Sequence, residues 1–360
     1  MRISSAEERE FLEGVFTAYS FSNEDSALLA DTLVDADLRG IASHGIQRLA
    51  WYIRMIKEGT IQPQNKVKVL KETPTSLLVD ANKNMGQIAS AFAMKNLIKK
   101  TKQVGLSMAV IRNSNHFGTA GYYSRMAVAE GLIGIATTNT RPLVAPTNAT
   151  QAFLGSNAFA FTFPASPHPF VFDGATSVVS GGKIQVLAKN NKPLPGDWAI
   201  DGERNVIHDA QAAEDILAKV AFTEHQTGGG VLTLGGNSEK NSNYKGFGNS
   251  LIIELLTGIL AQGSISADTN TGEHDFSQFF LTLDPAVFGD LETFATNATA
   301  MFTRIRGLEH TPGTQIMIPG DREYKNYHEN LQQGVLLDEK SAAEIKEIAQ
   351  ELEITVPKFK

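Results

Sequence analysis

The chain reads MAVIRNSNHFGTAGYYSRMAVA from residue 108 to residue 129. Its first four residues are apolar and predict a buried β-strand. The polar residues 112–118 predict a turn, and residues 120–129 predict a helix. A strand that passes through a turn into a helix indicates a mixed α/β fold. The same pattern puts His116 in a loop after a buried strand, where a side chain is well placed to reach a ligand.

A second segment, Ser43-His44-Gly45-Ile46-Gln47-Arg48, carries further candidate chemistry. Apolar residues recur at roughly helical spacing from residue 35 to residue 57, so we expect a helix there with His44 and Arg48 on one face. Gly45 opposes this helix by about 1 kcal/mol, unless a close approach of two parts of the chain requires a glycine.

The two segments together supply what reversible oxidation of a 2-hydroxy acid requires. The imidazoles of His44 and His116 titrate near neutral pH, and the planar guanidinium of Arg48 can grip a carboxylate in two places. Each residue taken singly also has a plainer interpretation. His44 and Arg48 would then lie on a solvated helix face, and His116 would be a structural or exposed loop residue. The combination points to an enzyme.

The rest of the chain continues the mixed pattern. Residues 4–58 are rich in helix formers, and Ser22 or Asn23 is a plausible N-cap. Both chain ends are expected to be helical, which suggests that they pack together as one domain. We expect strands at 76–79, 107–111, 132–137, 159–163, 170–172 and 279–283, and helices at 87–104, 209–223, 250–260 and 339–352.

Composition narrows the class of protein. The 360 residues suffice for one large domain or two smaller ones. The net charge of −7 makes nucleic acid an unlikely partner, and it supplies no general basic field for an anionic membrane. The absence of cysteine excludes disulfides, thiolate metal sites and a cysteine nucleophile. No signal peptide or membrane span is expected, so a cytoplasmic protein is the default.

The glycine-rich segments do not match familiar nucleotide-binding patterns. No Walker pattern follows Gly228-Gly229-Gly230 or Gly235-Gly236, and Gly246-Phe247-Gly248 lacks the third glycine and the preceding strand of a dinucleotide fingerprint. An ordinary Rossmann or P-loop site is therefore not expected. The histidines show no metal-binding spacing and no Gly-x-Ser-x-Gly occurs, so neither a catalytic metal nor a serine hydrolase is expected.

Two further positions suit a bound nucleotide. Lys245 precedes the expected helix at 250–260, where its charge would add to the anion-binding helix dipole. The turn Ile318-Pro319-Gly320-Asp321-Arg322 carries a carboxylate that can accept hydrogen bonds from ribose hydroxyls. A solvated loop lysine and an ordinary turn are the plainer interpretations.

Taken together and in order, these fragments resemble the malate/L-lactate/ureidoglycolate dehydrogenase family, which includes 2,3-diketogulonate reductase and sulfolactate dehydrogenase. The matching motifs run from about residue 3 to about residue 325, and a set this long is far more specific than any one member. They are Asp37-Leu38-Arg39-Gly40, Ser43-His44-Gly45 with Arg48, Ser114-Asn115-His116-Phe117-Gly118, Gly121-Tyr122-Tyr123, Thr138-Asn139-Thr140, Leu154-Gly155-Ser156-Asn157, Phe172-Asp173-Gly174-Ala175-Thr176-Ser177, Gly182-Lys183, Tyr244-Lys245-Gly246-Phe247-Gly248 and Pro319-Gly320-Asp321.

The resemblance implies a nicotinamide-dependent oxidoreductase of α/β (α+β) class whose fold is unlike the Rossmann domain. It implies a helical domain built from both chain ends, residues 1–72 and 322–360, and an α/β cofactor-binding domain at 73–321. It also implies a homodimer, with the active site near the boundary of domains and subunits.

The site residues follow by carry-over from the family. His116 corresponds to the general acid/base, and His44 holds that role in the diketogulonate reductases, so we expect His116 to act first with His44 assisting. Ser43 and Arg48 would hold the substrate carboxylate. The matching cofactor contacts are Thr140, Asp173, Gly174, Ala175, Lys245, Pro319, Gly320 and Asp321.

Several positions depart from the family pattern. Pro146-Thr147-Asn148-Ala149 replaces a Pro-aromatic-Gly-Gly turn, and Gly181 replaces a bulkier residue. Arg141 stands where relatives carry proline or an acidic residue, and it would suit the second carboxylate of a substrate such as malate or oxaloacetate; an arginine turned to solvent or in a structural ion pair is the plainer alternative. His274 falls where ureidoglycolate dehydrogenases place an arginine, which counts against ureidoglycolate.

Alternatives to a 2-hydroxy-acid dehydrogenase remain open at this level. An imine reductase acting on a cyclic α-imino acid would use Arg48 equally well, and a non-catalytic nucleotide binder would keep the fold without turnover. NAD has a modest advantage over NADP because Asp321 would repel a 2′-phosphate, although Arg322 could reverse that preference.

Overall fold

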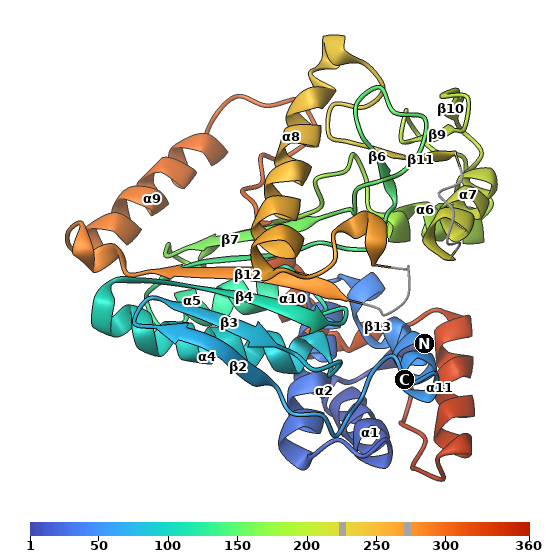
Figure 1. Cartoon of the computed structure of the whole chain (residues 1–360), viewed down its shortest axis with the longest axis horizontal. Helices are drawn as coiled ribbons and strands as arrows, with labels where there is room; N and C mark the ends of the chain where they lie inside the picture. Colours follow the sequence, from blue (N-terminus) through green and yellow to red (C-terminus); the bar gives the residue numbers. More distant parts are fainter. Residues whose placement is uncertain (223–227, 270–274) are drawn as a thin grey trace.

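The computed structural model describes residues 1–222, 228–269 and 275–360, and a seven-stranded sheet forms its centre (Figure 1). The strand order is β2-β3-β4-β12-β5-β7-β8, with β3 parallel to β4 and every other neighbouring pair antiparallel. The strands are β2 (Lys68–Thr73), β3 (Ser76–Asp80), β4 (Leu106–Ser114), β5 (Ile133–Thr138), β7 (Ala158–Phe163), β8 (Phe170–Gly174) and β12 (Phe276–Leu283).

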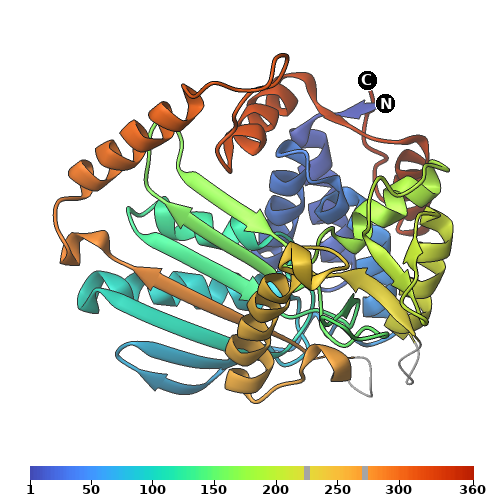
Figure 2. The same cartoon turned by 90° about the horizontal axis from the view of Figure 1, so that it is seen from above.

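Helices cover both faces of this sheet. On one face, α4 (Gly86–Val104) and α5 (Ala120–Val128) pack against the strands through a buried cluster that includes Leu97, Ile111 and Phe280. On the other face, α8 (Asn243–Glu254) continues into a π-helical turn, Leu255–Ile259, that packs against β12 and β4 (Figures 1 and 2). The sheet is therefore the middle of three layers.

A second, four-stranded sheet lies beside the first and has the order β10-β9-β11-β6. Apolar side chains such as Leu143, Ile184 and Leu217 form its core with two helices. The elements are β6 (Val144–Ala145), α6 (Gly181–Lys189), β9 (Ala199–Asp201), β10 (Val206–Ile207), α7 (Ala210–Phe222) and β11 (Gly229–Leu232).

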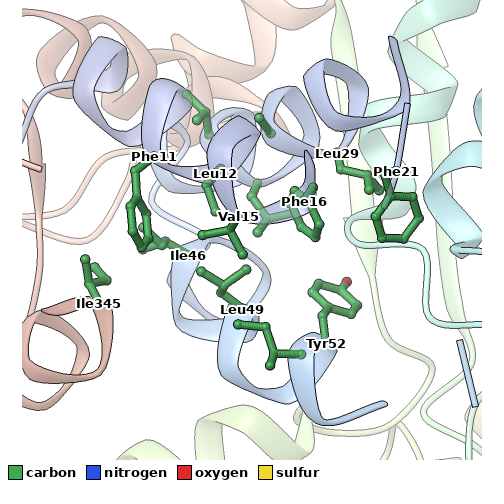
Figure 3. Close-up of a cluster of buried hydrophobic side chains, with 14 of the residues drawn as sticks. Phe11, Leu12, Val15, Phe16, Phe21, Leu29, Ile46, Leu49, Tyr52 and Ile345 are labelled. Atoms are coloured by element: carbon green, nitrogen blue, oxygen red, sulfur yellow. The ribbon is translucent and has the colours of Figure 1, made fainter. Parts of the chain in front are cut away.

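The helical part combines both ends of the chain. Strand β1 (Arg2–Ile3) pairs with β13 (Val335–Leu336), and both termini lie together in Figure 1. Figure 3 shows the shared apolar core, where Ile345 from near the C-terminus lies among side chains of the N-terminal helices. The helices are α1 (Ser5–Ala18), α2 (Asn23–Leu38), α3 (Leu49–Lys57), α10 (Asp321–Gln333) and α11 (Glu339–Glu351).

The remaining elements connect these parts. Helix α9 (Leu291–Arg306) follows β12 and runs along the outside of the molecule (Figures 1 and 2). Among the described residues, no helix combines the length and apolarity needed to cross a bilayer. Short 3-10 turns occupy Ala42–His44, Ile46–Arg48, Glu239–Asn241, Ser266–Asp268 and Pro285–Val287.

The structure confirms the mixed α/β class and most of the expected elements, including the N-cap at Ser22, which accepts a hydrogen bond from the backbone of Asp25 (3.1 Å). The single helix expected over residues 35–57 is wrong, because α2 ends at Leu38 and two 3-10 turns precede α3. Helix α8 begins at Asn243 rather than at residue 250, and β12 begins at Phe276 rather than at residue 279.

Candidate active site

The two histidines meet although they come from different parts of the fold. His44 ends the first 3-10 turn after α2, and His116 lies in the loop after β4. Their rings stack with centroids 5.4 Å apart and an interplanar angle of 25°. The ring of Trp51 in α3 meets His116 edge-on at 5.7 Å. The half-buried imidazoles therefore form one unit at the junction of the helical part and the central sheet.

A buried carboxylate shapes the turn that carries His44. Asp37, near the end of α2, accepts a hydrogen bond from the backbone N–H of Ile46 (2.6 Å). A Cβ on Gly45 would lie 2.0 Å from the carboxylate carbon and one oxygen of Asp37. The turn thus requires a glycine at position 45 because of this close approach and not because of its backbone angles. This explains why a residue that disfavours a helix occurs there.

The loop that carries His116 is held by its neighbours. The side chain of Asn115 donates to the backbone carbonyl of Asn84 (3.1 Å). The backbone carbonyl of Asn115 accepts a hydrogen bond from the side chain of Gln278 in β12 (3.2 Å). Phe117 is buried against Tyr123, and the Tyr123 hydroxyl donates to the Phe117 carbonyl. His116 therefore sits on a backbone that its neighbours hold in place.

Positive charge surrounds the imidazoles. Burial and the Arg48 cation lower the pKa of His44 to about 4. Burial, with His44, Arg48 and Arg141 nearby, holds the pKa of His116 well below its usual range. Burial, with Arg48 and Arg54 nearby, lowers the pKa of Arg141 to about 10. Both histidines are neutral at neutral pH, and the site has an excess of positive charge that an anion would relieve.

Arg48 and Ser43 brace each other. The Nε and Nη2 atoms of Arg48 donate to the Ser43 carbonyl (3.1 and 2.9 Å), and the guanidinium lies 5.8 Å from the Trp51 ring centroid. The Ser43 hydroxyl lies 2.9 Å from Nδ1 of His44. One edge of the guanidinium is thus used to hold the turn, which fixes its direction. A Cβ on Gly182, at the start of α6, would lie 3.4 Å from the Cβ of Ser43.

A pocket of about 590 Å³ opens between the central sheet and α10. Two segments expected to contact the cofactor line it, Asp173 of β8 and the turn Pro319-Gly320. The ring of Tyr324 stacks on that of His168 at 4.4 Å in the same wall. Segments far apart in the sequence therefore form one concave surface with aromatic and backbone groups, the usual character of a small-molecule site.

The comparisons with known proteins agree on one family. A family model described as malate/L-lactate dehydrogenase matches residues 3–346. The chain is 38% identical over 343 residues to a malate dehydrogenase of Pyrococcus horikoshii, covering 94% of this chain and 92% of that protein. It is 34% identical to the malate/(S)-sulfolactate dehydrogenase of Methanothermus fervidus over 360 residues, covering 98% and 99% of the two chains.

A solved structure gives the same result. The crystal structure of malate dehydrogenase from Entamoeba histolytica matches with a TM-score of 0.95 and 31% identity, and the match covers 99% of each chain. The chain belongs to the malate/L-lactate dehydrogenase family. Membership supports a hydroxy-acid dehydrogenase, and it agrees with an α/β fold that carries no dinucleotide fingerprint.

In this member of the malate/L-lactate dehydrogenase family, Asp321 is already engaged. Its carboxylate accepts two hydrogen bonds from Arg306 (2.6 and 3.0 Å) and one from the backbone of Ile318 (2.9 Å), and it lies 3.0 Å from Nε2 of His168. Asp321 starts α10, where a negative charge is favoured. The structure therefore gives this carboxylate a clear role in building the pocket wall.

The remaining expected cofactor contacts of this family member are spread more widely. Thr140 follows β5, and its hydroxyl accepts from the backbone of Ser156 (2.9 Å). Ala175 follows β8 beside Gly174. Lys245 is exposed in the first turn of α8, and neither it nor Thr140 lines the 590 Å³ pocket. His274 lies outside the described residues. No group of side chains in the described ranges could hold a metal ion, so none is assigned.

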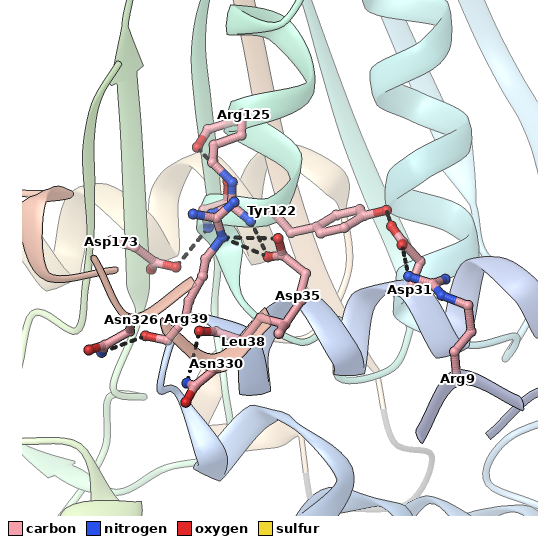
Figure 4. A network of polar contacts seen from close by, with 12 residues as sticks. Arg9, Asp31, Asp35, Leu38, Arg39, Tyr122, Arg125, Asp173, Asn326 and Asn330 are labelled. Carbon is pink, nitrogen blue, oxygen red and sulfur yellow. Dashed lines mark hydrogen bonds and ion pairs between the residues drawn. The ribbon is translucent and has the colours of Figure 1, made fainter. Parts of the chain in front are cut away.

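Sequence reasoning missed several residues that build this family member's site. Tyr52 bonds Nδ1 of His116 at 2.7 Å, and Gln87 bonds Tyr52 at 2.8 Å. Arg39 and Arg125 line the pocket and share the Asp35 carboxylate (Figure 4). Tyr52 lies four residues after Arg48, and the helix expected over residues 35–57 already put both on one face, but that spacing alone does not distinguish Tyr52 from an ordinary helix residue.

Proposed function

We propose that this protein is a cytoplasmic, NAD-dependent dehydrogenase that interconverts a small 2-hydroxy acid and the corresponding 2-keto acid, with a malate-like dianion as substrate. The observation that carries the proposal is the stacked pair His44 and His116 beside the guanidinium groups of Arg48 and Arg141. Neutral imidazoles can move a proton, and clustered guanidiniums can bind carboxylates.

The charge of the site supports a dianion. Burial lowers the pKa of both Arg48 and Arg141, and the Arg48 cation lowers the pKa of Arg141 further. A substrate with two carboxylates would neutralise both cations. Ser43, which contacts His44, would bind the carboxylate beside the reacting carbon together with Arg48.

Proton transfer is assigned to His116, with His44 assisting. In the oxidising direction, a neutral imidazole removes the proton of the substrate hydroxyl. In the reducing direction, the imidazolium returns the proton to the developing alkoxide. Binding of a dianion raises the pKa of His116, because it offsets the Arg48 and Arg141 charges that depress the pKa in the free enzyme. Substrate binding would thus bring the acid into its working range.

The pocket between β8 and α10 fits a nicotinamide coenzyme. When bound, such a coenzyme supplies the hydride acceptor or donor. Gly320 in the lining has a φ of 102°, a conformation that favours glycine, and it lies close to the backbone of Val171 in β8. Asp173 and Glu323 in the lining disfavour a 2′-phosphate. The lining also contains Arg39 and Arg125, but both are already paired with Asp35, and Arg322 is exposed outside the lining. This distribution of charge supports NAD over NADP. Thr140, Ala175 and Lys245 are proposed as further contacts.

The test is oxidation of NADH and NADPH by the purified protein with a panel of 2-keto acids, including pyruvate, oxaloacetate, phenylpyruvate, diketogulonate and piperideine-2-carboxylate. We expect turnover with NADH, fastest with oxaloacetate. His116→Ala should lower kcat by about 10²- to 10⁴-fold, the usual range for a lost acid/base, whereas Arg48→Ala should mainly raise KM. Arg141→Ala should lower the preference for oxaloacetate over pyruvate.

Each arm of the panel can contradict one part of the proposal. Unchanged turnover in His116→Ala would move the acid/base role to His44. An unchanged ratio of oxaloacetate to pyruvate rates in Arg141→Ala would remove Arg141 from substrate recognition. Turnover of piperideine-2-carboxylate alone would favour the imine reductase, and nucleotide binding by calorimetry without any turnover would favour a non-catalytic binder.

A further inference from the structure

A chain of hydrogen bonds runs from the central helix α4 to the candidate acid/base. The Nε2 atom of Gln87 donates to the hydroxyl oxygen of Tyr52 (2.8 Å), and that hydroxyl lies 2.7 Å from Nδ1 of His116. Gln87 and Tyr52 are fully buried. The three side chains come from α4, α3 and the loop after β4, so their meeting is a property of the folded molecule and not of one local motif.

The packing that brings them together is close. Gln87 is the second residue of α4, and a Cβ on the preceding residue, Gly86, would lie 2.2 Å from the carbonyl oxygen of Asn115 and 2.7 Å from that of His116. The start of α4 therefore lies directly against the backbone of the His116 loop. A glycine at position 86 permits this close approach, which brings Gln87 within hydrogen-bonding distance of Tyr52.

The direction of the hydrogen bonds fixes a proton. Because the Tyr52 oxygen receives the N–H of Gln87, its own O–H is available to donate to Nδ1 of His116. The backbone N–H of Gly118 points at the same nitrogen (3.3 Å). A nitrogen that accepts from two donors carries no hydrogen, so the neutral ring holds its proton on Nε2.

This arrangement does not suit a general base that acts through Nε2. A neutral imidazole that takes a proton at Nε2 must hold its other proton on Nδ1. Tyr52 would then accept from Nδ1 and donate its O–H elsewhere. The amide of Gln87 offers that acceptor, because rotation of the amide by half a turn exchanges its oxygen and nitrogen.

One unpaired atom of Gln87 could serve as the acceptor in the rotated orientation of its amide. The Oε1 atom of Gln87 is buried and has no hydrogen-bond partner within the described part of the chain. Leaving a buried acceptor unpaired costs about 1–3 kcal/mol. After rotation, Oε1 would accept the Tyr52 hydroxyl, and the amide nitrogen would take the vacated position. Each orientation pairs one end of the amide with Tyr52, so rotation exchanges one hydrogen bond for another.

We propose that Gln87 is a positioning residue whose amide orientation sets, through Tyr52, which ring nitrogen of His116 holds the proton. The amide as observed gives the Nε2–H form, and the rotated amide gives the Nδ1–H form that can act as a base. The catalytic meaning of this switch rests on the proposed dehydrogenase function, but the control of the tautomer does not.

The test is ¹⁵N NMR of the full-length protein labelled in histidine, because the two nitrogens of each tautomer have distinct chemical shifts. The His116 signals are assigned as those absent from His116→Gln. In the wild type without substrate, we expect mainly the Nε2–H form. Tyr52→Phe, which removes the hydroxyl that donates to Nδ1, should lower the ratio of Nε2–H to Nδ1–H several-fold. Gln87→Met keeps the length but has no oxygen that can accept the Tyr52 hydroxyl, so the hydroxyl keeps Nδ1 as its acceptor and the ratio should rise.

Gln278→Met is the matched control. Gln278 is also fully buried, also has an unpaired Oε1 in the described chain, and holds the same loop through the carbonyl of Asn115, but it makes no bond to Tyr52 or His116. It should leave the His116 tautomer unchanged. An equal shift in all three variants would show that loosening of the loop, and not the relay, sets the tautomer.

The remaining outcomes separate the relay from the function. Unchanged tautomer ratios in both Gln87→Met and Tyr52→Phe would overturn the proposal, and Tyr52→Phe decides alone if Gln87→Met does not fold. A tautomer shift in a protein with no turnover on the keto-acid panel would keep the relay and reject the dehydrogenase. In an active enzyme, the pH profile of kcat/KM should move in Gln87→Met and stay in place in Gln278→Met.

Discussion

Glu8 and Asp37 bring two carboxyl groups together in the apolar core beneath the His44 turn. Their residues are 0% and 2% exposed, and neither oxygen of Glu8 meets a donor within the described chain. Burial and the neighbouring Asp37 raise the pKa of Glu8 well above its usual range, and burial raises the pKa of Asp37 to about 6. One proton shared by the pair satisfies Glu8 and leaves Asp37 able to hold Ile46.

This pair predicts how stability depends on pH. Both pKa values rise on folding, so the folded protein binds more protons than the unfolded chain above about pH 4. The contribution of the Glu8–Asp37 pair to the free energy of unfolding is full below that pH. It falls as the pH rises through about 6 and beyond. Glu8→Gln keeps a donor toward Asp37 without a proton to lose. Relative to wild type, it should gain stability with rising pH, by up to about 1.4 kcal/mol per pH unit per proton.

Urea unfolding at several pH values between 5 and 8 measures this difference. Glu10→Gln, an exposed position on the same helix, is the control and should track the wild type. A stability difference between Glu8→Gln and wild type that stays constant with pH would mean that the pair is not protonated in the folded state.

The sequence predicted the reactive side chains better than it predicted their supports. His44, Arg48 and His116 were singled out because together they suit the oxidation of a 2-hydroxy acid, and Arg141 because it departs from the family pattern. The structure gathers them. Their roles stay predictions. Tyr52 and Gln87 resemble ordinary helix residues in one dimension, and only the packing of α3 against α4 reveals their contact.

At the scale of elements, one carboxylate joins α2 to α5. Asp35 binds Arg39 of the following turn (2.9 Å) and also Arg125 of α5, as Figure 4 shows. All three side chains are less than 20% exposed. The asparagine side chains of α10 hold the same region, since Asn326 donates to the Arg39 carbonyl (3.1 Å). These partly buried ion pairs therefore attach the helical part to α5, which packs against the central sheet.

Asp35→Asn should therefore be costly, because it removes the carboxylate that two partly buried guanidiniums share. We expect a loss of roughly 2–3 kcal/mol in the free energy of unfolding, measured by denaturant titration. Glu130→Gln is the matched control, since it removes an exposed pair with Lys102 at 49% exposure and should cost less than about 1 kcal/mol. Equal losses in the two variants would refute a special role for Asp35.

Element boundaries were predicted where caps and breakers are local and missed where packing decides. Ser22 caps α2 through its own side chain, as its sequence context indicates. Gly40, whose φ is 79°, terminates α2 after Leu38, and Asp37 then binds Ile46, a contact between residues nine apart that helical spacing cannot reveal. Helices α6, α9 and α10 were not predicted, although Tyr324, Tyr327 and Leu331 recur at helical spacing in the otherwise polar α10.

For the molecule as a whole, we propose a homodimer and a division into a helical domain and an α/β domain close to the expected boundaries. The cluster that joins residues 3–88 to residues 335–359 supports the helical domain. Five apolar side chains along α8 and its π-helical turn support the dimer, because their exposed fractions lie between 39% and 58%. They are Leu251, Ile252, Leu255, Ile259 and Leu260. An exposed apolar run of this length is typical of an interface.

The dimer is tested by sedimentation at several protein concentrations. We expect the wild type to sediment as a dimer of 39.0 kDa chains and Ile252→Asp to sediment as a monomer. Met301→Asp, at a similarly exposed position on α9, should stay dimeric. A dimer that persists in Ile252→Asp would place the interface elsewhere, and a monomeric wild type would reject the homodimer.

Strand β12 lies at the middle of the central sheet but near the end of the sequence. Until a ribosome has made the preceding 275 residues, the edges of β4 and β5 that face β12 have no partner. The two halves of the sheet therefore keep unpaired backbone hydrogen-bonding groups along these edges. The protein can close its sheet only when synthesis is more than three-quarters complete. We therefore expect its yield in a cell to depend on chaperones and on the speed of translation more than its final stability would suggest.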